Sequence, residues 1–171
     1  MEYGIKKCKP LIPGRMITLI PTIKEDLETF FQFQLDEEAN NMAAFTAKDP
    51  NDKAAYLEKY SKFLNDPSIN MRTIKANGEI IGSIAKFVMH NEAGITYWFG
   101  RKYWGQGFAT TALKNFLQIE QTRPLHAGVA FDNHGSQKVL EKCGFIKTGE
   151  DKGFANARQA EIVEFLYKLE G

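Results

Sequence analysis

The sequence has little net charge, few cysteines and no long apolar run. Its 22 lysines and arginines oppose 21 aspartates and glutamates, which leaves a formal net charge of +1. This balance gives no overall attraction to nucleic acid or to an anionic membrane surface. No apolar stretch approaches the roughly 18 residues that a membrane span requires, and the polar start at 1–10 precedes no signal-peptide core. We therefore expect neither a nucleic-acid partner nor membrane association.

The two cysteines, Cys8 and Cys143, lie far apart and form no metal-ligand pair. We therefore expect no metal and a reduced, cytoplasmic setting. Internal repeats and low-complexity linkers are also absent, and 171 residues with a 43% apolar fraction suffice for one well-buried core. The sequence predicts a single domain over 1–171, as a monomer or a homodimer, with an irregular lead-in at 1–15.

The first third of the sequence shows a short strand pattern followed by two helical patterns. A strand is expected at 16–20, and Thr22 and Glu25 have the spacing of a capping box that begins a helix ending near Leu35. The segment 49–52 is typical of a second helix start, and Asn65-Asp66-Pro67 ends that helix.

Strand patterns then dominate until a glycine-rich turn in mid-chain. Segments 71–75, 79–88 and 95–99 are strand-like, and Asn77-Gly78 is a strong hairpin signal between the first two. Apolar residues return to helical spacing after Gly107. Further patterns predict a strand at Leu125–Phe131, a helix between Asn133 and Gly144, and a last strand at Ile162–Leu169. The order, roughly β-α-α-β-β-β-α-β-α-β-β, predicts an α/β or α+β sheet with helices on its faces.

The turn Trp104-Gly105-Gln106-Gly107-Phe108-Ala109 has the character of an anion site. It links a strand to a helix, and the first amides of a helix are unpaired and favour an anion. Glycine also lets a ligand approach the backbone closely, so the turn can bind a pyrophosphate. A tight turn that needs two glycines for its dihedral angles explains the same residues. A P-loop pattern is absent, and Thr110 occupies the last glycine position of a dinucleotide fingerprint, which disfavours a nicotinamide or flavin enzyme.

A second segment, Asn133 to Phe145, reads N-H-G-S-Q-K-V-L-E-K-C-G-F, and taken alone it is a capped helix that ends at a glycine. The two segments together resemble the GNAT N-acetyltransferase superfamily, and most closely its ribosomal-protein-alanine N-acetyltransferase (RimJ/RimL-like) branch. Tyr103 to Thr110 matches the Y-W-G-x-G-[YF]-A-T turn of that branch, and the second segment matches its N-x-x-S-x-x-[VL]-[LM]-E-[KR]-x-G-F helix. The resemblance covers roughly Met71 to Phe145.

The resemblance implies a mixed, mostly antiparallel sheet of about six or seven strands and about four helices. It also implies acetyl-CoA as co-substrate, in a V-shaped opening between the parallel strands Ile95–Phe99 and Leu125–Phe131. Backbone groups of Tyr97, Trp98 and Phe99 would then pair with the pantetheine arm. The implied pyrophosphate turn consists of Trp104, Gly105, Gln106, Gly107, Phe108, Ala109 and Thr110. Asn133 would bond the pantetheine arm or a water, and Ser136 and Lys138 would lie near the thiol or phosphates.

The chain departs from the wider superfamily at two positions. Trp104 replaces a Gln or Arg, and Leu140 replaces the Tyr that serves as general acid; the RimJ/RimL-like branch shares both departures. Leu140 cannot donate a proton, so Ser136 is our candidate donor to the leaving thiolate. His126 is a candidate base, although a half-buried strand histidine explains it as well. A backbone amide near Trp98 or Phe99 is the candidate for holding the tetrahedral oxyanion.

Two functions from different classes follow. The first is an acetyl-CoA-dependent N-acetyltransferase that moves the acetyl group to a primary amine of a protein N-terminus, a polyamine or a small molecule by direct attack on the thioester. The alternative is a non-catalytic, acetyl-CoA-binding regulatory module, motivated by the missing Tyr. Asp36, Glu37 and Glu38 either attract a cationic acceptor or form a solvated helix end. The acceptor and the length of the acyl chain stay open.

Overall fold

The computed structural model describes residues 16–171, so the expected lead-in and Cys8 lie outside the described residues. Its centre is a seven-strand sheet in the order β1-β2-β3-β4-β5-β7-β6. Neighbouring strands are antiparallel except for one parallel pair, β4 and β5. The fold class expected from the sequence is confirmed. The strands are β1 (Ile17–Pro21), β2 (Asn70–Ala76), β3 (Glu79–Met89), β4 (Glu92–Phe99), β5 (Leu125–Ala130), β6 (Ile146–Ala155) and β7 (Ala160–Leu169).

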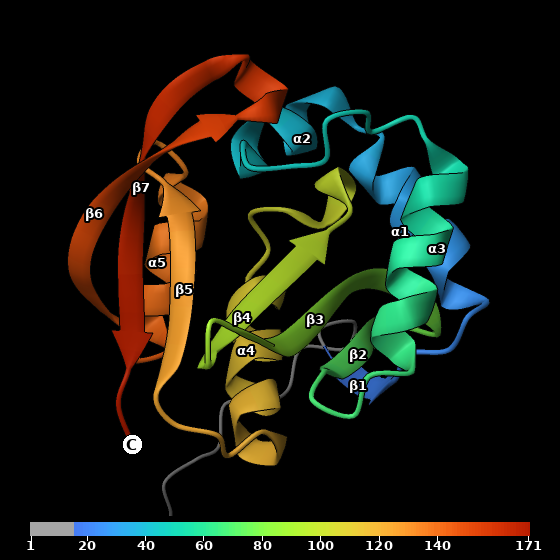
Figure 1. The fold of residues 1–171 in the computed structure, drawn as a ribbon. Helices are drawn as coiled ribbons and strands as arrows, with labels where there is room; N and C mark the ends of the chain where they lie inside the picture. Colours follow the sequence, from blue (N-terminus) through green and yellow to red (C-terminus); the bar gives the residue numbers. More distant parts are fainter. Residues whose placement is uncertain (1–15) are drawn as a thin grey trace, which may run out of the picture.

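The helices cover both faces of the sheet (Figure 1). Helices α1 and α3 lie on one face, α4 and α5 lie on the other, and α2 lies beside the tip of the β6–β7 hairpin. The described residues contain α1 (Asp26–Gln34), α2 (Glu37–Ala43), α3 (Lys53–Leu64), α4 (Phe108–Ile119) and α5 (His134–Lys142), with short 3₁₀ turns η1 (Arg101–Tyr103) and η2 (Asn156–Arg158). None of these helices is long and apolar enough to cross a membrane.

Local signals account for several element boundaries. Asn77 and Gly78 have φ angles of 52° and 78°, as a two-residue hairpin between β2 and β3 requires. Asp52 accepts a hydrogen bond from the Ala55 amide and caps α3. Gly144 ends α5 with a φ of 91°. These predictions are confirmed.

Two predictions about the first helices are wrong. The capping box does not form, because the Thr22 hydroxyl contacts Thr73 Oγ1 on β2 at 3.0 Å instead of capping a helix. The Asp26 carboxylate takes over the helix start and accepts a hydrogen bond from the Ile23 amide. Helix α2 was not expected, since its seven residues carry little apolar periodicity. The Asp36 carboxylate starts it by accepting the Ala39 amide.

The parallel pair is joined at one point and then opens. A single register pair, Gly94 with His126, links β4 and β5 near the start of each strand. Beyond it β4 stays paired with β3, and β5 stays paired with β7. The two strands therefore diverge toward their carboxyl ends and leave a gap in the middle of the sheet (Figure 1).

The main core lies between the sheet and the α4–α5 face. Phe116, Leu113 and Leu140 from these helices are buried against Ile84 and Leu125 of the sheet. The main core is thus on the α4–α5 side of the sheet.

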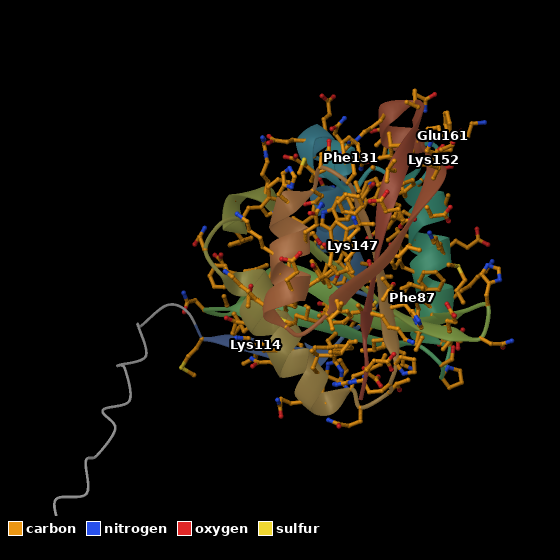
Figure 2. The ribbon with its side chains drawn as sticks, turned by 90° about the vertical axis from the view of Figure 1, so that its left-hand side faces the viewer. Phe87, Lys114, Phe131, Lys147, Lys152 and Glu161 are labelled. Atoms are coloured by element: carbon orange, nitrogen blue, oxygen red, sulfur yellow. The ribbon has the colours of Figure 1, made fainter. Side chains whose placement is uncertain are left out.

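One of the two edges of the sheet is β6, which faces the viewer in Figure 2 and carries Lys147 and Lys152. Edge lysines oppose strand-to-strand association.

Candidate active site

The glycine turn forms the amino end of α4. Gly105 and Gly107 have φ angles of 70° and 82°, in the left-handed region that favours glycine, and Gly107 is the N-cap of the helix. A Cβ at either position would meet nothing within 4 Å. The dihedral angles therefore explain both glycines, and the open space in front of them also leaves the helix amides accessible.

A cavity of about 520 Å³ extends from this turn to α5. The predicted cofactor residues that line it are Tyr97, Trp98, Phe99, Trp104, Gly105, Gly107, Phe108, Ala109, Thr110, Asn133, Ser136 and Lys138. Gln106 does not line it, because its side chain turns back to donate to the Lys102 carbonyl at 2.9 Å. Lys142 also lines the cavity and was not predicted; its spacing of four residues from Lys138 places both on one helix face and would have indicated it.

Ser136 and Tyr97 meet where α5 approaches β4. The Tyr97 hydroxyl lies 2.8 Å from Ser136 Oγ, and the Asn133 side chain fixes the first turn of α5 by accepting the Ser136 amide at 3.2 Å. Burial raises the pKa of Tyr97 to about 12, with the hydrogen bond from Ser136 acting in the opposite direction. The phenol is therefore a neutral hydrogen-bond donor at physiological pH.

The open edge of β4 presents fewer backbone groups than expected. The Trp98 carbonyl lies against β3, only 2.3 Å from where a Cβ on Gly82 would be. Because successive residues of a strand point their backbone groups to opposite sides, those of Tyr97 and Phe99 face the gap. The Trp104 indole N–H already donates to the Phe99 carbonyl at 3.1 Å. Tyr97 thus has the freest backbone groups along this edge.

A larger cavity of about 990 Å³ lies on the other side of the gap, between the sheet and the α1–α3 face. The two cavities share the lining residues Ala43, Tyr97, Trp98, Asn133 and Ser136. Within residues 16–171, the Trp98 indole N–H is the one buried side-chain polar atom without a hydrogen-bond partner. A ligand oxygen at this junction would relieve the cost of about 1–3 kcal/mol that such a donor carries.

His126 lies at the closed end of the gap. Its Nδ1 is 3.2 Å from the Ala93 carbonyl, so a neutral ring donates there and keeps Nε2 as an acceptor. It lines the larger cavity but not the smaller one. Its register partner, Gly94, is three residues before Tyr97, about 10 Å away along a strand. The structure therefore does not bring His126 to the junction of the cavities.

Glu164 on β7 is a site residue that the sequence did not reveal. Its carboxylate occupies the space over Gly128, where a Cβ would lie 2.0 Å from Oε1. Gly128 is two residues beyond His126 on the same face of β5, so this carboxylate lies over β5, beyond the point where β4 and β5 are paired, and it lines the larger cavity. Burial, together with neighbouring Asp151, raises the pKa of Glu164. The glutamate is one polar residue in an alternating strand, and nothing local in the sequence marks it.

The acidic residues after the first helix serve a structural role. Arg101 on η1 pairs with Asp36 at 2.9 Å and also with Glu38. These carboxylates tie α2 to the segment that precedes the glycine turn, and they do not line the larger cavity. Cys143 is half-buried against α4, and burial raises the pKa of its thiol. Among the described residues, no group of three or more His, Cys, Asp and Glu side chains has the arrangement of a metal site.

The parallel strand pair thus opens beside the amino end of a helix, and one cavity lies on each side of the opening. The family model of the acetyltransferase (GNAT) domain matches residues 16–146. The chain belongs to this family and is a GNAT N-acetyltransferase.

Relatives span nearly the whole chain at low identity. An uncharacterized N-acetyltransferase p20 from Bacillus licheniformis is 25% identical over 166 residues, which are 90% of this chain and 92% of the relative. The fold is similar to that of the microcin C7 self-immunity acetyltransferase MccE in complex with acetyl-CoA and AMP (TM-score 0.75, 18% identity, 91% and 92% of the two chains). It is also similar to Mycobacterium smegmatis RimJ in complex with CoA-disulfide (TM-score 0.72, 20% identity, 91% and 82%).

Proposed function

We propose that the enzyme transfers an acetyl group directly from acetyl-CoA to a primary amine through the gap between β4 and β5. The observation that supports this most strongly is the meeting of two cavities at Tyr97, Trp98 and Ser136. The cofactor enters from the α4–α5 face and the amine from the α1–α3 face. The thioester then lies at the one place that both ligands reach.

The cofactor is assigned to the smaller cavity. Amides from Trp104 to Thr110 hold the pyrophosphate, with Gly107 at the helix start. Lys138 and Lys142 lie across the cavity and favour the phosphate charges. The pantetheine arm pairs with the Tyr97 backbone at the open edge of β4. Asn133 fixes the first turn of the nearby helix α5 by accepting the Ser136 amide. The same motifs favour placement of the enzyme in the RimJ/RimL-like branch.

The reaction needs no covalent protein intermediate. The neutral amine nitrogen attacks the thioester carbon, so a C–N bond forms, the C–S bond breaks, and the CoA thiolate leaves. The Phe99 amide, on the open edge of β4, is placed to stabilise the oxyanion. A base takes the proton that the nitrogen loses, and a donor on the other side of the sheet stabilises the sulfur.

Ser136 is the donor at the sulfur. When the Tyr97 phenol donates to Ser136 Oγ, the serine hydroxyl is free to donate to the thiolate. A phenol of pKa about 12 is too weak an acid to protonate a thiolate whose thiol has a pKa of about 8.5. The pair therefore stabilises the leaving group by hydrogen bonding, and water supplies the proton.

Glu164 is our preferred base, ahead of His126. Its carboxylate lies over Gly128 of β5, beyond the paired part of the two strands, whereas His126 lies where the strands are still paired. A raised pKa also brings a carboxylate closer to the working pH of a general base. His126 is then left to bind the acceptor or to hold the closed end through the Ala93 carbonyl.

Release of free thiol from acetyl-CoA, measured across a panel of primary amines, tests this function. We expect amine-dependent thiol release and one new acetamide per thiol, seen by mass spectrometry. Acetyl-CoA that binds without amine-dependent release from any member would contradict it and would favour the non-catalytic acetyl-CoA-binding module. A panel of peptides, polyamines, aminoglycosides and aromatic amines covers the main acceptor classes.

A further inference from the structure

The larger cavity has a wall of aromatic side chains. Six of its aromatic lining residues come from five different elements and loops: Phe33, Phe45, Tyr56, Tyr60, Phe87 and Trp98. Helix α3 contributes two of them and has no fully buried residue of its own. A helix that presents half-buried rings toward an open cavity provides the contact surface for an apolar ligand.

The rings of α3 are stacked and held in place. Tyr56 and Tyr60 have centroids 4.4 Å apart, and Tyr56 lies 5.3 Å from Phe31 on α1. Burial raises the pKa of the Tyr60 phenol, so the ring stays neutral. This wall is therefore preformed, and binding against it loses little side-chain freedom.

Charge in the same cavity favours a cation near the gap. Its lining includes the carboxylates of Asp49, Asp52, Glu92 and Glu164, with Lys59 as the one lysine. Lys59 turns its ammonium over the Tyr60 and Phe63 rings, 5.7 Å from each centroid. Glu164 is the carboxylate over β5, next to the gap where the reacting nitrogen must lie. The cavity thus offers carboxylates to an ammonium and aromatic rings to an apolar group.

We infer that the acceptor is a small molecule with one primary amine carried on an aromatic body. This inference rests on the proposed function, since it assigns the amine that the acetyl group reaches. The cavity volume of about 990 Å³ is at the upper end of typical sites for drug-sized ligands, about 300–1,000 Å³. A linear polyamine would leave the stacked tyrosines without a partner, and an aminoglycoside would place many hydroxyls against them.

The test compares kcat/KM for thiol release with tryptamine, 2-phenylethylamine, spermidine, kanamycin and an alanine-starting peptide. We expect the two aromatic amines to exceed the other three by about tenfold or more. Tyr60→Ala should raise KM for tryptamine about 3- to 10-fold, the effect of losing one aromatic contact, while Tyr60→Phe should not. Phe154→Ala, on the exposed edge of β6 and outside the cavity, is the matched control.

The outcomes separate this inference from the proposed function. Faster acetylation of spermidine, kanamycin or the peptide would overturn the aromatic acceptor and leave the acetyltransferase function intact. An unchanged KM for tryptamine in a folded Tyr60→Ala variant would also overturn it. Acetyl-CoA binding without thiol release from any of the five amines would overturn both.

Discussion

The hydroxyl groups of Tyr97 and Ser136 share one hydrogen bond where the smaller cavity, proposed for the cofactor, meets the larger cavity, proposed for the acceptor. The Tyr97 phenol and Ser136 Oγ are 2.8 Å apart, and Leu140, one turn further on α5, is buried and apolar. This side of the sheet thus has a hydrogen-bond donor for sulfur but no strong acid. A CoA thiol leaves readily near neutral pH, so a donor of this strength suffices.

Loss of this donor should have a modest effect. We expect Ser136→Ala to lower kcat by about 10- to 100-fold, the effect of losing one hydrogen bond to a charged group. Tyr97→Phe should lower it only about 2- to 10-fold, because the serine hydroxyl remains and one neutral hydrogen bond is lost. Steady-state rates with the fastest amine check both values. Wild-type turnover in Ser136→Ala would remove Ser136 from the mechanism. Positioning of the two substrates would then be the protein's remaining contribution on this side of the sheet.

The carboxylate on the other side of the gap should control the pH dependence. Burial raises the pKa of Glu164, so the base becomes protonated, and inactive, at a higher pH than an ordinary glutamate would. We expect the acidic limb of the kcat profile to lie above the usual glutamate pKa of about 4.3 and to vanish in Glu164→Gln. His126→Gln is the matched variant. If that variant loses the limb and Glu164→Gln keeps it, His126 is the base.

At the scale of elements, α4 and its glycine turn form the proposed phosphate site. Gly107→Ala adds a methyl group in front of the helix amides, at a φ of 82°. Gly78→Ala, in the β2–β3 hairpin at a φ of 78°, imposes the same backbone strain away from the site. Each should cost about 1–2 kcal/mol of stability.

Only the change in the turn should affect the cofactor. We expect Gly107→Ala to weaken acetyl-CoA binding tenfold or more by calorimetry, and Gly78→Ala to leave it unchanged. Equal affinities in the two folded variants would mean that the pyrophosphate binds elsewhere.

The cofactor half of the site could be predicted from sequence because its signals are local. The two glycines, the Asn133 cap and Gly144 each act within one turn of chain. In the structure each has the local conformation that the sequence predicts. The acceptor half could not, because Glu164, Tyr60 and Phe87 meet only after β7, α3 and β3 are packed. Helix α2 could not be predicted either, because its Asp36 cap pairs with Arg101, which lies 65 residues later in the chain.

At the scale of the whole molecule, an ion pair holds the tip of the β6–β7 hairpin against the loop between β5 and α5. Both terminal guanidinium nitrogens of Arg158 reach Asp132, at 2.6 and 2.8 Å, and its Nε donates to the Asn41 carbonyl within α2. The tip, α2 and the loop before α5 are therefore tied together, and Figure 1 shows the tip beside α2. The expected monomer or homodimer and the cytoplasmic setting stay predictions.

Stability should reflect this pair at neutral pH. The hydrogen bond from Arg158 lowers the pKa of Asp132, so its contribution is present above the unfolded value of about 3.9 and is lost as pH falls through the folded pKa. We expect Asp132→Asn to lose about 1 kcal/mol or less at pH 7, because the carboxylate is partly exposed, and the difference should disappear near pH 2. Urea unfolding at both pH values checks this. Glu161→Gln, on the exposed start of β7 (Figure 2), is the control.

Thermal unfolding with and without acetyl-CoA tests the central claim most directly, because the claim requires the native fold to bind this cofactor. Ligand at about 100 times its dissociation constant adds about 2.7 kcal/mol, which raises Tm by roughly 5–11 °C for a chain of this size. We predict that rise with acetyl-CoA and with desulfo-CoA, which keeps the pyrophosphate and pantetheine. An unchanged Tm at millimolar concentrations of both would contradict the account.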